Sequence, residues 1–501
     1  MNYRTRLAWI AAVVAIATFA NGGDKASGRS STAATSENGK IPITTKSEDA
    51  KNEFLQGRDL FERLLAQDSL QHFDKALALD PDFASAELAR ANASPTIKEF
   101  LEHLNKAVSL ADKASDGEKL MILANEAGSN GEVNKQKADL NNLVAAFPND
   151  ERAQFALGGY YFGQQEWAHA IEHNKKAIEI APNYSPAYNI LGYSYRQAGD
   201  YADAEQAFKK YIDLIPNDPN PYDSYAELLL KIGRFDESVA QYRKALSIDP
   251  KFNPSRFGLS ADLTYMGKPD QAQTELQNMA NLARNDGELR TALFGMAVLA
   301  SDGGKFDQAL QVMDKEYAVA EKKNDVMSMA GDLQAKGNIA AQMQDYDVAQ
   351  QQFDRSFRIV QDSNLSQEIK DNSRRLHEFN LSAIALNKKD YSVAKAHCEE
   401  FRRGAQAGNN PLQLKQWHEL AGRIALAEKD YDKAIAELIQ ANEQNPRNLY
   451  RLGEAYQGKG ETAKAQEFFS QAANFNPLPQ LNYAFIRAKA QRMVAGKKPT
   501  T

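Results

Sequence analysis

The chain has 501 residues, of which 60 are Lys or Arg and 66 are Asp or Glu, so its formal net charge is −6. Hydrophobic residues make up 43% and charged residues 25%, a globular composition that argues against a disordered chain. The acidic balance and the absence of a long basic run exclude nucleic acid as an expected partner. The single cysteine, Cys398, excludes a disulfide framework and a zinc site built on several thiolates.

Residues 1–20 have the pattern of a secretory signal peptide. Arg4 and Arg6 precede an apolar run at 7–20, which is shorter than the roughly 17–25 residues of a membrane-spanning helix. We therefore expect export to the periplasm or the extracellular space, with membrane anchoring by uncleaved residues 7–20 as the alternative. Residues 21–46 are rich in Gly, Ser, Thr and Ala and are expected to form a flexible linker.

Residues 47–116 are expected to contain degenerate N-terminal helical repeats, and residues 117–286 have a regular period. Pro148, Pro182, Pro216 and Pro250 follow one another at 34-residue intervals. With these prolines at position 32 of a unit, small residues recur at positions 8 and 20 and large ones at positions 11, 17 and 24. Small side chains let two antiparallel helices approach closely, a glycine near position 15 permits the turn, and the proline ends the second helix. One unit shows the pattern in full: Gly192, Tyr195, Gly199, Tyr201, Ala204 and Phe208.

This pattern resembles the tetratricopeptide repeat (TPR) family. The resemblance implies an all-α fold, a right-handed superhelical solenoid of stacked antiparallel helix pairs, for which we expect ten or eleven units. Residues 287–414 hold longer repeats with a period nearer 40, and residues 415–479 hold two C-terminal units that overlap at 446–448. Residues 480–495 are expected to form one capping helix, followed by a tail at 496–501.

Three motifs suggest chemistry that the repeat positions explain better. His169 and His173 belong to an H-x-x-E-H string but fall at positions 19 and 23, on the expected solvent side of a second helix. The glycine-rich string 453–460 approaches a phosphate-binding loop, yet Gly460 stands where Ser or Thr is needed. Cys398 falls at a core position. We therefore predict no catalytic residue, no metal, no cofactor and no enzymatic activity.

A further motif is the carboxylate clamp of one TPR subclass. Asn338 and Asn380 lie where the two clamp asparagines would be, but Gln334 replaces a lysine and Glu419 or Leu420 replaces an arginine. Because these losses remove most of the charge-assisted hydrogen bonds, we do not expect a clamp.

The expected binding site is the concave strip of the solenoid, formed by positions 2, 5, 9 and 12 of the first helices. Its mixture of aromatic and charged residues suits an extended peptide or a partner helix. We predict a non-enzymatic interaction scaffold or adaptor, exported from the cytoplasm, for a protein partner that the sequence does not identify. The alternative is a regulatory or sensor component of a signalling system that lacks its own catalytic domain. The predicted groove residues are Arg152, Phe155, Phe162, Asn189, Tyr193, Arg196, Asp223, Glu227 and Leu230.

Overall fold

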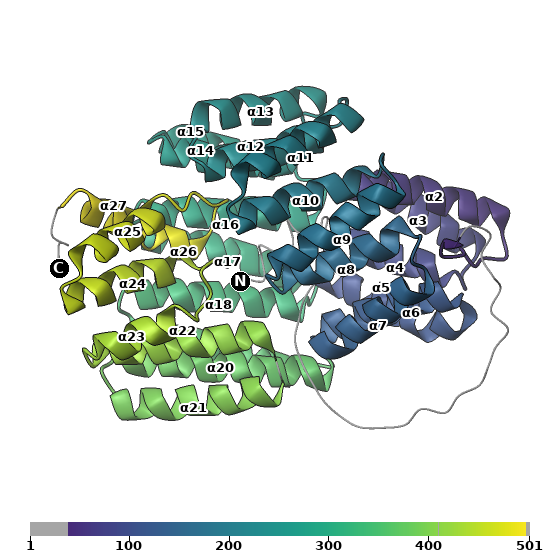
Figure 1. Ribbon diagram of the computed structural model, residues 1–501. Coiled ribbons are helices and arrows are strands. Elements are labelled where there is room, and N and C mark those ends of the chain that lie inside the picture. The colour runs from purple at the N-terminus through teal and green to yellow at the C-terminus, as the bar shows by residue number, and fades with distance from the viewer. Residues whose placement is uncertain (1–38, 409, 497–501) are drawn as a thin grey trace. The chain divides into compact units, whose positions relative to one another are not determined.

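The computed structural model describes residues 39–408 and 410–496 (Figure 1). Helices contain 79% of the residues, and the described ranges contain no β-strand. The prediction of an all-α fold is confirmed. The signal-peptide prediction for residues 1–20 and the tail at 497–501 fall outside the described residues.

The chain divides into two compact units, and the boundary lies between Leu228 and Leu229 within one helix. Residues 247–249 group with the first unit. In the N-terminal unit the helices are α2 (Glu48–Glu62), α3 (Ala66–Leu79), α4 (Ala84–Ala93), α5 (Ile97–Leu110), a 3-10 turn (Ala111–Lys113), α6 (Asp116–Asn130), α7 (Val133–Ala146), α8 (Glu151–Gly163), α9 (Trp167–Ile180), α10 (Ser185–Ala198), α11 (Tyr201–Leu214) and most of α12 (Pro219–Lys231).

The C-terminal unit continues the series with longer helices in its middle. Its helices are α13 (Phe235–Ile248), α14 (Asn253–Tyr265), α15 (Pro269–Asn281), α16 (Asp286–Asp302), α17 (Phe306–Lys322), α18 (Val326–Gln342), α19 (Tyr346–Gln361), α20 (Gln367–Asn387), α21 (Tyr391–Ala407), α22 (Pro411–Ala427), α23 (Tyr431–Leu438), α24 (Pro446–Lys459), α25 (Thr462–Ala473), α26 (Leu481–Ala484) and α27 (Arg487–Val494).

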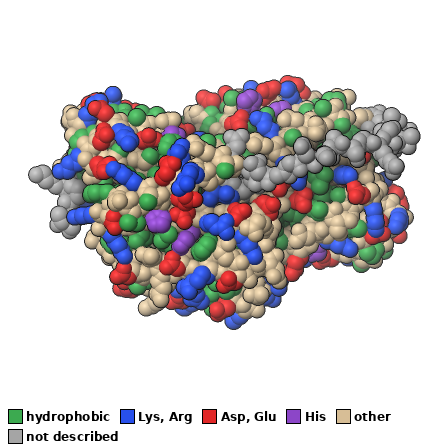
Figure 2. All heavy atoms as spheres, turned by 90° about the horizontal axis from the view of Figure 1, so that it is seen from below, with side chains coloured by type: hydrophobic (Ala, Val, Ile, Leu, Met, Phe, Trp, Pro, Cys, Tyr) green, Lys and Arg blue, Asp and Glu red, His purple; other side chains and the backbone are tan. Residues whose placement is uncertain are grey.

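In the described ranges, α2 to α25 form twelve successive helix-turn-helix units, where ten or eleven were expected. The longer period of residues 287–414 comes from longer helices: α16 has 17 residues and α20 has 21, against 13 in α8. The overlap at 446–448 is accommodated by α23, which has only 8 residues. Acidic and basic side chains are interspersed over the face of the molecule shown in Figure 2.

The close approach of paired helices depends on a residue pair spaced by 16. A Cβ built on Gly192 would lie 2.7 Å from Phe208, and one built on Gly57 would lie 2.7 Å from Phe73. Position 8 must therefore stay small because the side chain at position 24 fills the space above it. Gly199, in the turn between α10 and α11, has φ +89° and ends α10 in the left-handed conformation that glycine adopts most easily.

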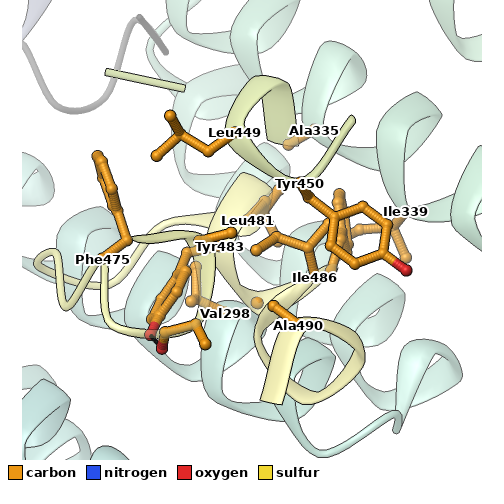
Figure 3. Packing of buried hydrophobic residues seen from close by; sticks show 14 of the residues in the cluster. Val298, Ala335, Ile339, Leu449, Tyr450, Phe475, Leu481, Tyr483, Ile486 and Ala490 are labelled. Atoms are coloured by element: carbon orange, nitrogen blue, oxygen red, sulfur yellow. Dashed lines mark hydrogen bonds between the residues drawn. The ribbon is translucent and has the colours of Figure 1, made fainter. Parts of the chain in front are cut away.

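The C-terminal cap differs from the prediction of a single helix over 480–495. It consists of α26 and α27, separated at Phe485 and Ile486, whose side chains are buried. Burying both of these large side chains turns the chain, so that α26 packs against α16 and α27 against α25. In the resulting cluster Tyr483 and Ile486 pack with Val298 of α16 (Figure 3).

Candidate interaction surfaces

The predicted groove begins with Arg152 on α8, which is bound by a helix from the first repeat. Its Nε donates to Glu62 Oε1 at 2.6 Å and its Nη2 to Glu62 Oε2 at 3.0 Å. The guanidinium lies over the ring of Tyr184, which also makes a T-shaped contact with the ring of Phe155. Burial alone would lower the pKa of Arg152, but Glu62 and Glu151 hold it above its usual value. Arg152 is thus part of an internal contact between α2 and α8.

The next predicted groove residues form a second internal group. Arg196 Nη1 donates to Glu227 Oε2 at 3.1 Å, and the Arg196 guanidinium lies 4.6 Å from the centre of the Tyr193 ring. Tyr193 in turn meets the ring of Phe208 edge-on. Only 5% of Tyr193 and 1% of Leu230 are exposed.

The structure places most of these side chains in internal contacts, and their role in binding a partner stays a prediction. Aromatic and charged side chains at positions 2, 5, 9 and 12 satisfy one another, and residues from α2 cover the start of the strip. Arg63, which ends α2, reaches Asp218 just before α12, with an Nε–Oδ2 distance of 2.7 Å. Phe155 is half-buried, whereas the remaining predicted groove residues are all buried: Phe162, Asn189, Asp223 and Glu227.

Residues 39–46, expected to be part of a flexible linker, instead form an extended segment bound to the repeats. We call this stretch the strap segment. Three of its backbone N–H groups donate hydrogen bonds to carboxylates that lie near the starts of first helices. The three hydrogen bonds are Ile41 N to Asp150 Oδ2 (2.9 Å), Thr44 N to Glu118 Oε1 (3.0 Å) and Lys46 N to Asp80 Oδ2 (3.0 Å).

Side chains of the strap segment add specific contacts. Lys40 pairs with Glu151, and Thr45 Oγ1 donates to Asp80 Oδ2 at 2.6 Å. Ile41 occupies a notch that exists because residue 117 is glycine: a Cβ there would lie 2.9 Å from Ile41 Cγ2. Sequence reasoning missed this surface, although acids recur near the starts of first helices.

Another surface lies in the C-terminal unit, on α22 and α24. Glu419 is buried and accepts from Arg451 Nη1 at 2.9 Å. Arg423 and Arg447 lie close enough to lower the pKa of Glu419, together with Arg451, to about 2, although its burial acts to raise it. In the described chain neither Arg423 nor Arg447 has its own hydrogen-bonded carboxylate. Arg447 lies over the ring of Phe485.

The two unpaired arginines are in an unfavourable environment. Burial, reinforced by the charge of Arg451, lowers the pKa of Arg423 to about 9 and that of Arg447 to about 10. Both occupy inner-strip positions of the repeat, position 9 for Arg423 and position 2 for Arg447. The sequence already indicated this surface, because Arg423 and Arg447 fall at strip positions where Glu419 is the one acid that could pair with them.

The histidine string has a structural explanation. Both rings stack on Tyr161, and His173 Nδ1 lies 2.9 Å from Gln154 Oε1. Side chains 19 residues apart pair in the same way elsewhere, as His72 does with Glu53 and His397 with Glu378. His169 is exposed as predicted, whereas His173 is half-buried. No group of three or more His, Cys, Asp or Glu side chains in the described residues is arranged to hold a metal ion.

The other residues of the motifs considered in the sequence also have structural roles. Cys398 is buried in the α20–α22 core, and burial raises the pKa of its thiol to about 11. Gly453 packs against Phe469, and Gly460 ends α24 at φ +88°. Asn380 donates to the side chain of Gln334 and Asn338 to its backbone carbonyl, so both clamp asparagines are bound internally. Among the described helices, none is long and apolar enough to cross a membrane.

All the family models that match the chain describe the same repeat. Tetratricopeptide-repeat family models match residues 123–185, 173–206, 195–263 and 425–489. No curated protein sequence matches the chain.

Solved structures are similar to parts of the chain. A thermophilic TPR protein from Thermus thermophilus is 24% identical, with 43% of this chain and 98% of that chain covered and a TM-score of 0.29. The MamA protein is 20% identical, with coverage of 33% and 91% and a TM-score of 0.28. YrrB, described as a TPR protein with an unusual peptide-binding site, is 17% identical, with coverage of 36% and 91% and a TM-score of 0.25. Since the family models match repeats in both units and helix-turn-helix units fill the described chain, this protein belongs to the tetratricopeptide-repeat family.

Proposed function

We propose that this repeat protein is an exported adaptor whose C-terminal unit binds an acidic segment of a partner protein. The repeat architecture supports a protein-interaction scaffold, and this fold is generally non-catalytic. Non-enzymatic action and export are part of the proposal. Export rests on the basic and apolar pattern of residues 1–20.

The unpaired Arg423 and Arg447 carry the proposal for the binding surface. A guanidinium in a crowded, partly dry site is unfavourable unless an anion satisfies it. Arg451 is already bound to Glu419, so the two remaining cations are available to carboxylates from outside. Arginine suits this role because its planar group binds a carboxylate through two hydrogen bonds. Phe485, whose buried ring lies beneath Arg447, helps to hold the guanidinium in place.

The test is binding of an acetylated and amidated peptide of alternating Glu and Ala to the full chain, followed by fluorescence anisotropy. Arg423→Ala with Arg447→Ala should weaken binding by at least tenfold, and added salt should weaken binding to the unmodified chain. The matched control is Arg403→Ala, because Arg403 is exposed and pairs with Glu400 on its own helix. Equal loss in the control and the double variant would contradict the proposed surface.

Export has a separate test. Mass spectrometry of the protein from its native source should find a new N-terminus near Thr18 or Asn21. Cytosolic protein that begins at Met1 would refute export, and full-length membrane-bound protein would support the anchored alternative.

A further inference from the structure

We propose that Asp80, Glu118 and Asp150 form a binding site for an extended peptide segment, and that the strap segment is its built-in occupant. In this view residues 39–46 shield the site until a partner segment with similar chemistry displaces them. We call the three acids the acidic row. The site lies in the N-terminal unit and does not depend on the arginine surface proposed above.

The acidic row recognises an extended backbone because each of its acids has two oxygens with separate tasks. Asp150 Oδ1 accepts from the N–H groups of Arg152 and Ala153, at 2.8 Å and 3.2 Å, and so caps its own helix. Asp150 Oδ2 accepts the N–H of Ile41. In Glu118, Oε2 accepts from Ser115 in a capping box, whereas Oε1 accepts from Thr44 N and also from the Ser85 hydroxyl.

This division keeps the acidic row in place without the strap segment. The bonds that orient Asp150 and Glu118 belong to their own helices and remain when residues 39–46 leave. Asp80 is oriented similarly, because its Oδ1 accepts from Asp82 N at 3.2 Å. A site that is already ordered binds with little loss of conformational freedom. An emptied row is therefore ready for another extended segment.

The side-chain contacts define the partner's chemistry. A cation is required to match Lys40 beside Glu151, and the next residue must be apolar to fill the notch at Gly117. A hydroxyl four residues later would take the place of Thr45 at Asp80. Ser115 Oγ donates to the carbonyl oxygen of Pro42 at 3.0 Å, and proline has no N–H. A partner residue at this place therefore needs only its carbonyl oxygen. The expected partner is a protein with an extended segment of this order.

Shielding follows from the covalent link between site and occupant. Only Ser47 separates the strap segment from α2, so its effective concentration at the row is of the order of millimolar or higher. A partner that binds weakly is excluded, and one that binds tightly, or that acts when the strap segment is pulled away, gains access. The strap residues are half-buried or exposed, so a partner segment can reach and displace them.

The test uses the full chain with Ile41→Asp and Thr44→Pro. The first change places a carboxylate beside those of Asp150 and Glu151, and the second removes the N–H that Glu118 binds. The probe is a labelled, acetylated peptide with the sequence of residues 39–46, and the measurement is fluorescence anisotropy. We expect this released variant to bind the peptide at least tenfold more tightly than the unmodified chain. Glu48→Ala is the control, since Glu48 is exposed and pairs with Lys51 on its own helix, and it should leave the affinity unchanged.

A further substitution tests the row itself. Asp150→Asn keeps the oxygen that caps α8 and replaces the acceptor of Ile41 N–H by a donor. Added to the released variant, it should weaken peptide binding at least tenfold while circular dichroism stays unchanged. The proposal is overturned if the released variant binds no better than the unmodified chain, or if Asp150→Asn has no effect.

Hydrogen exchange on the unmodified chain provides a measurement that needs no folded variant. The amides of Ile41, Thr44 and Lys46 should be protected and should exchange together, faster than those in the middle of α2. Unprotected amides at these positions would show that the strap segment does not occupy the row, and would overturn the proposal.

Discussion

Gly337 of α18 and Phe353 of α19 lie 16 residues apart and touch so closely that a Cβ on Gly337 would lie 2.4 Å from the phenyl ring. Gly331, on the same helix, has no heavy atom within 4 Å of the corresponding Cβ position. The two glycines share a helix and differ in what a methyl group would meet.

Gly337→Ala should lower the free energy of unfolding by ~1–3 kcal/mol, because the added carbon overpacks the helix pair. Gly331→Ala should raise it by ~0.5–1 kcal/mol, since alanine costs less backbone entropy in a helix than glycine does. Urea unfolding monitored by circular dichroism measures both. Similar effects at the two positions would show that the Gly337–Phe353 contact does not control the helix spacing.

Asp262 on α14 predicts a dependence of stability on pH. It is fully buried, and burial raises the pKa of its carboxyl to about 8, against a lowering by the Ser238 hydroxyl. The folded chain then holds a proton that the unfolded chain releases near pH 4, so this residue's contribution to stability falls as pH rises from about 4 to about 8.

Asp262→Asn should remove that part of the pH dependence, because the amide stays neutral. The variant should gain at least ~1 kcal/mol over the unmodified chain at pH 8 relative to the difference at pH 5. Chemical unfolding at the two pH values measures the change. A difference between the two proteins that is the same at both pH values would refute a raised pKa.

Two of the arginines around Glu419 should affect stability in opposite directions. Arg451→Met leaves the buried Glu419 carboxylate without its ion-pair partner and should cost ~3–5 kcal/mol. Arg423→Met removes an unpaired, partly desolvated cation and should raise stability by ~1 kcal/mol, after allowance for solvent screening. Thermal unfolding of both variants checks this contrast. Destabilisation by both would mean that Arg423 has a structural partner.

The two histidines on α9 should also differ. His169→Ala should change stability by less than ~0.5 kcal/mol, because its side chain is exposed. His173→Ala removes a hydrogen bond to Gln154 and a half-buried ring on Tyr161, and should cost ~1 kcal/mol. Zinc bound stoichiometrically to the purified protein and lost in the double variant would contradict both assignments.

The helix pairs could be predicted from the sequence because their determinants are local. Gly192 and Phe208 belong to one 34-residue unit, and so do Gly199 and the turn that it makes. The longer period of 287–414 left extended helices or longer loops open, and the structure has longer helices there.

The surfaces could not be predicted in the same way, because they depend on contacts between distant units. Tyr193 and Arg196 are residue types that are common in binding strips, but Arg196 is bound to Glu227 of the next unit. Arg152 is bound to Glu62, 90 residues earlier. A repeat pattern predicts the direction in which each side chain points and does not show what has folded back against it. The same reason explains the strap segment, whose composition is that of a linker.

The ion pair between Arg63 and Asp218 also bears on how fast the N-terminal unit folds. Repeat arrays fold quickly because most of their contacts join neighbouring residues, so little chain must be closed into a loop. This pair closes a loop of 155 residues, and that between Lys40 and Glu151 closes one of 111. Both ends of these loops must meet before the unit is complete. We therefore expect its helices to form early and its final closure to be slow. We also expect the unit to melt as one block, where an open array would fray from an end.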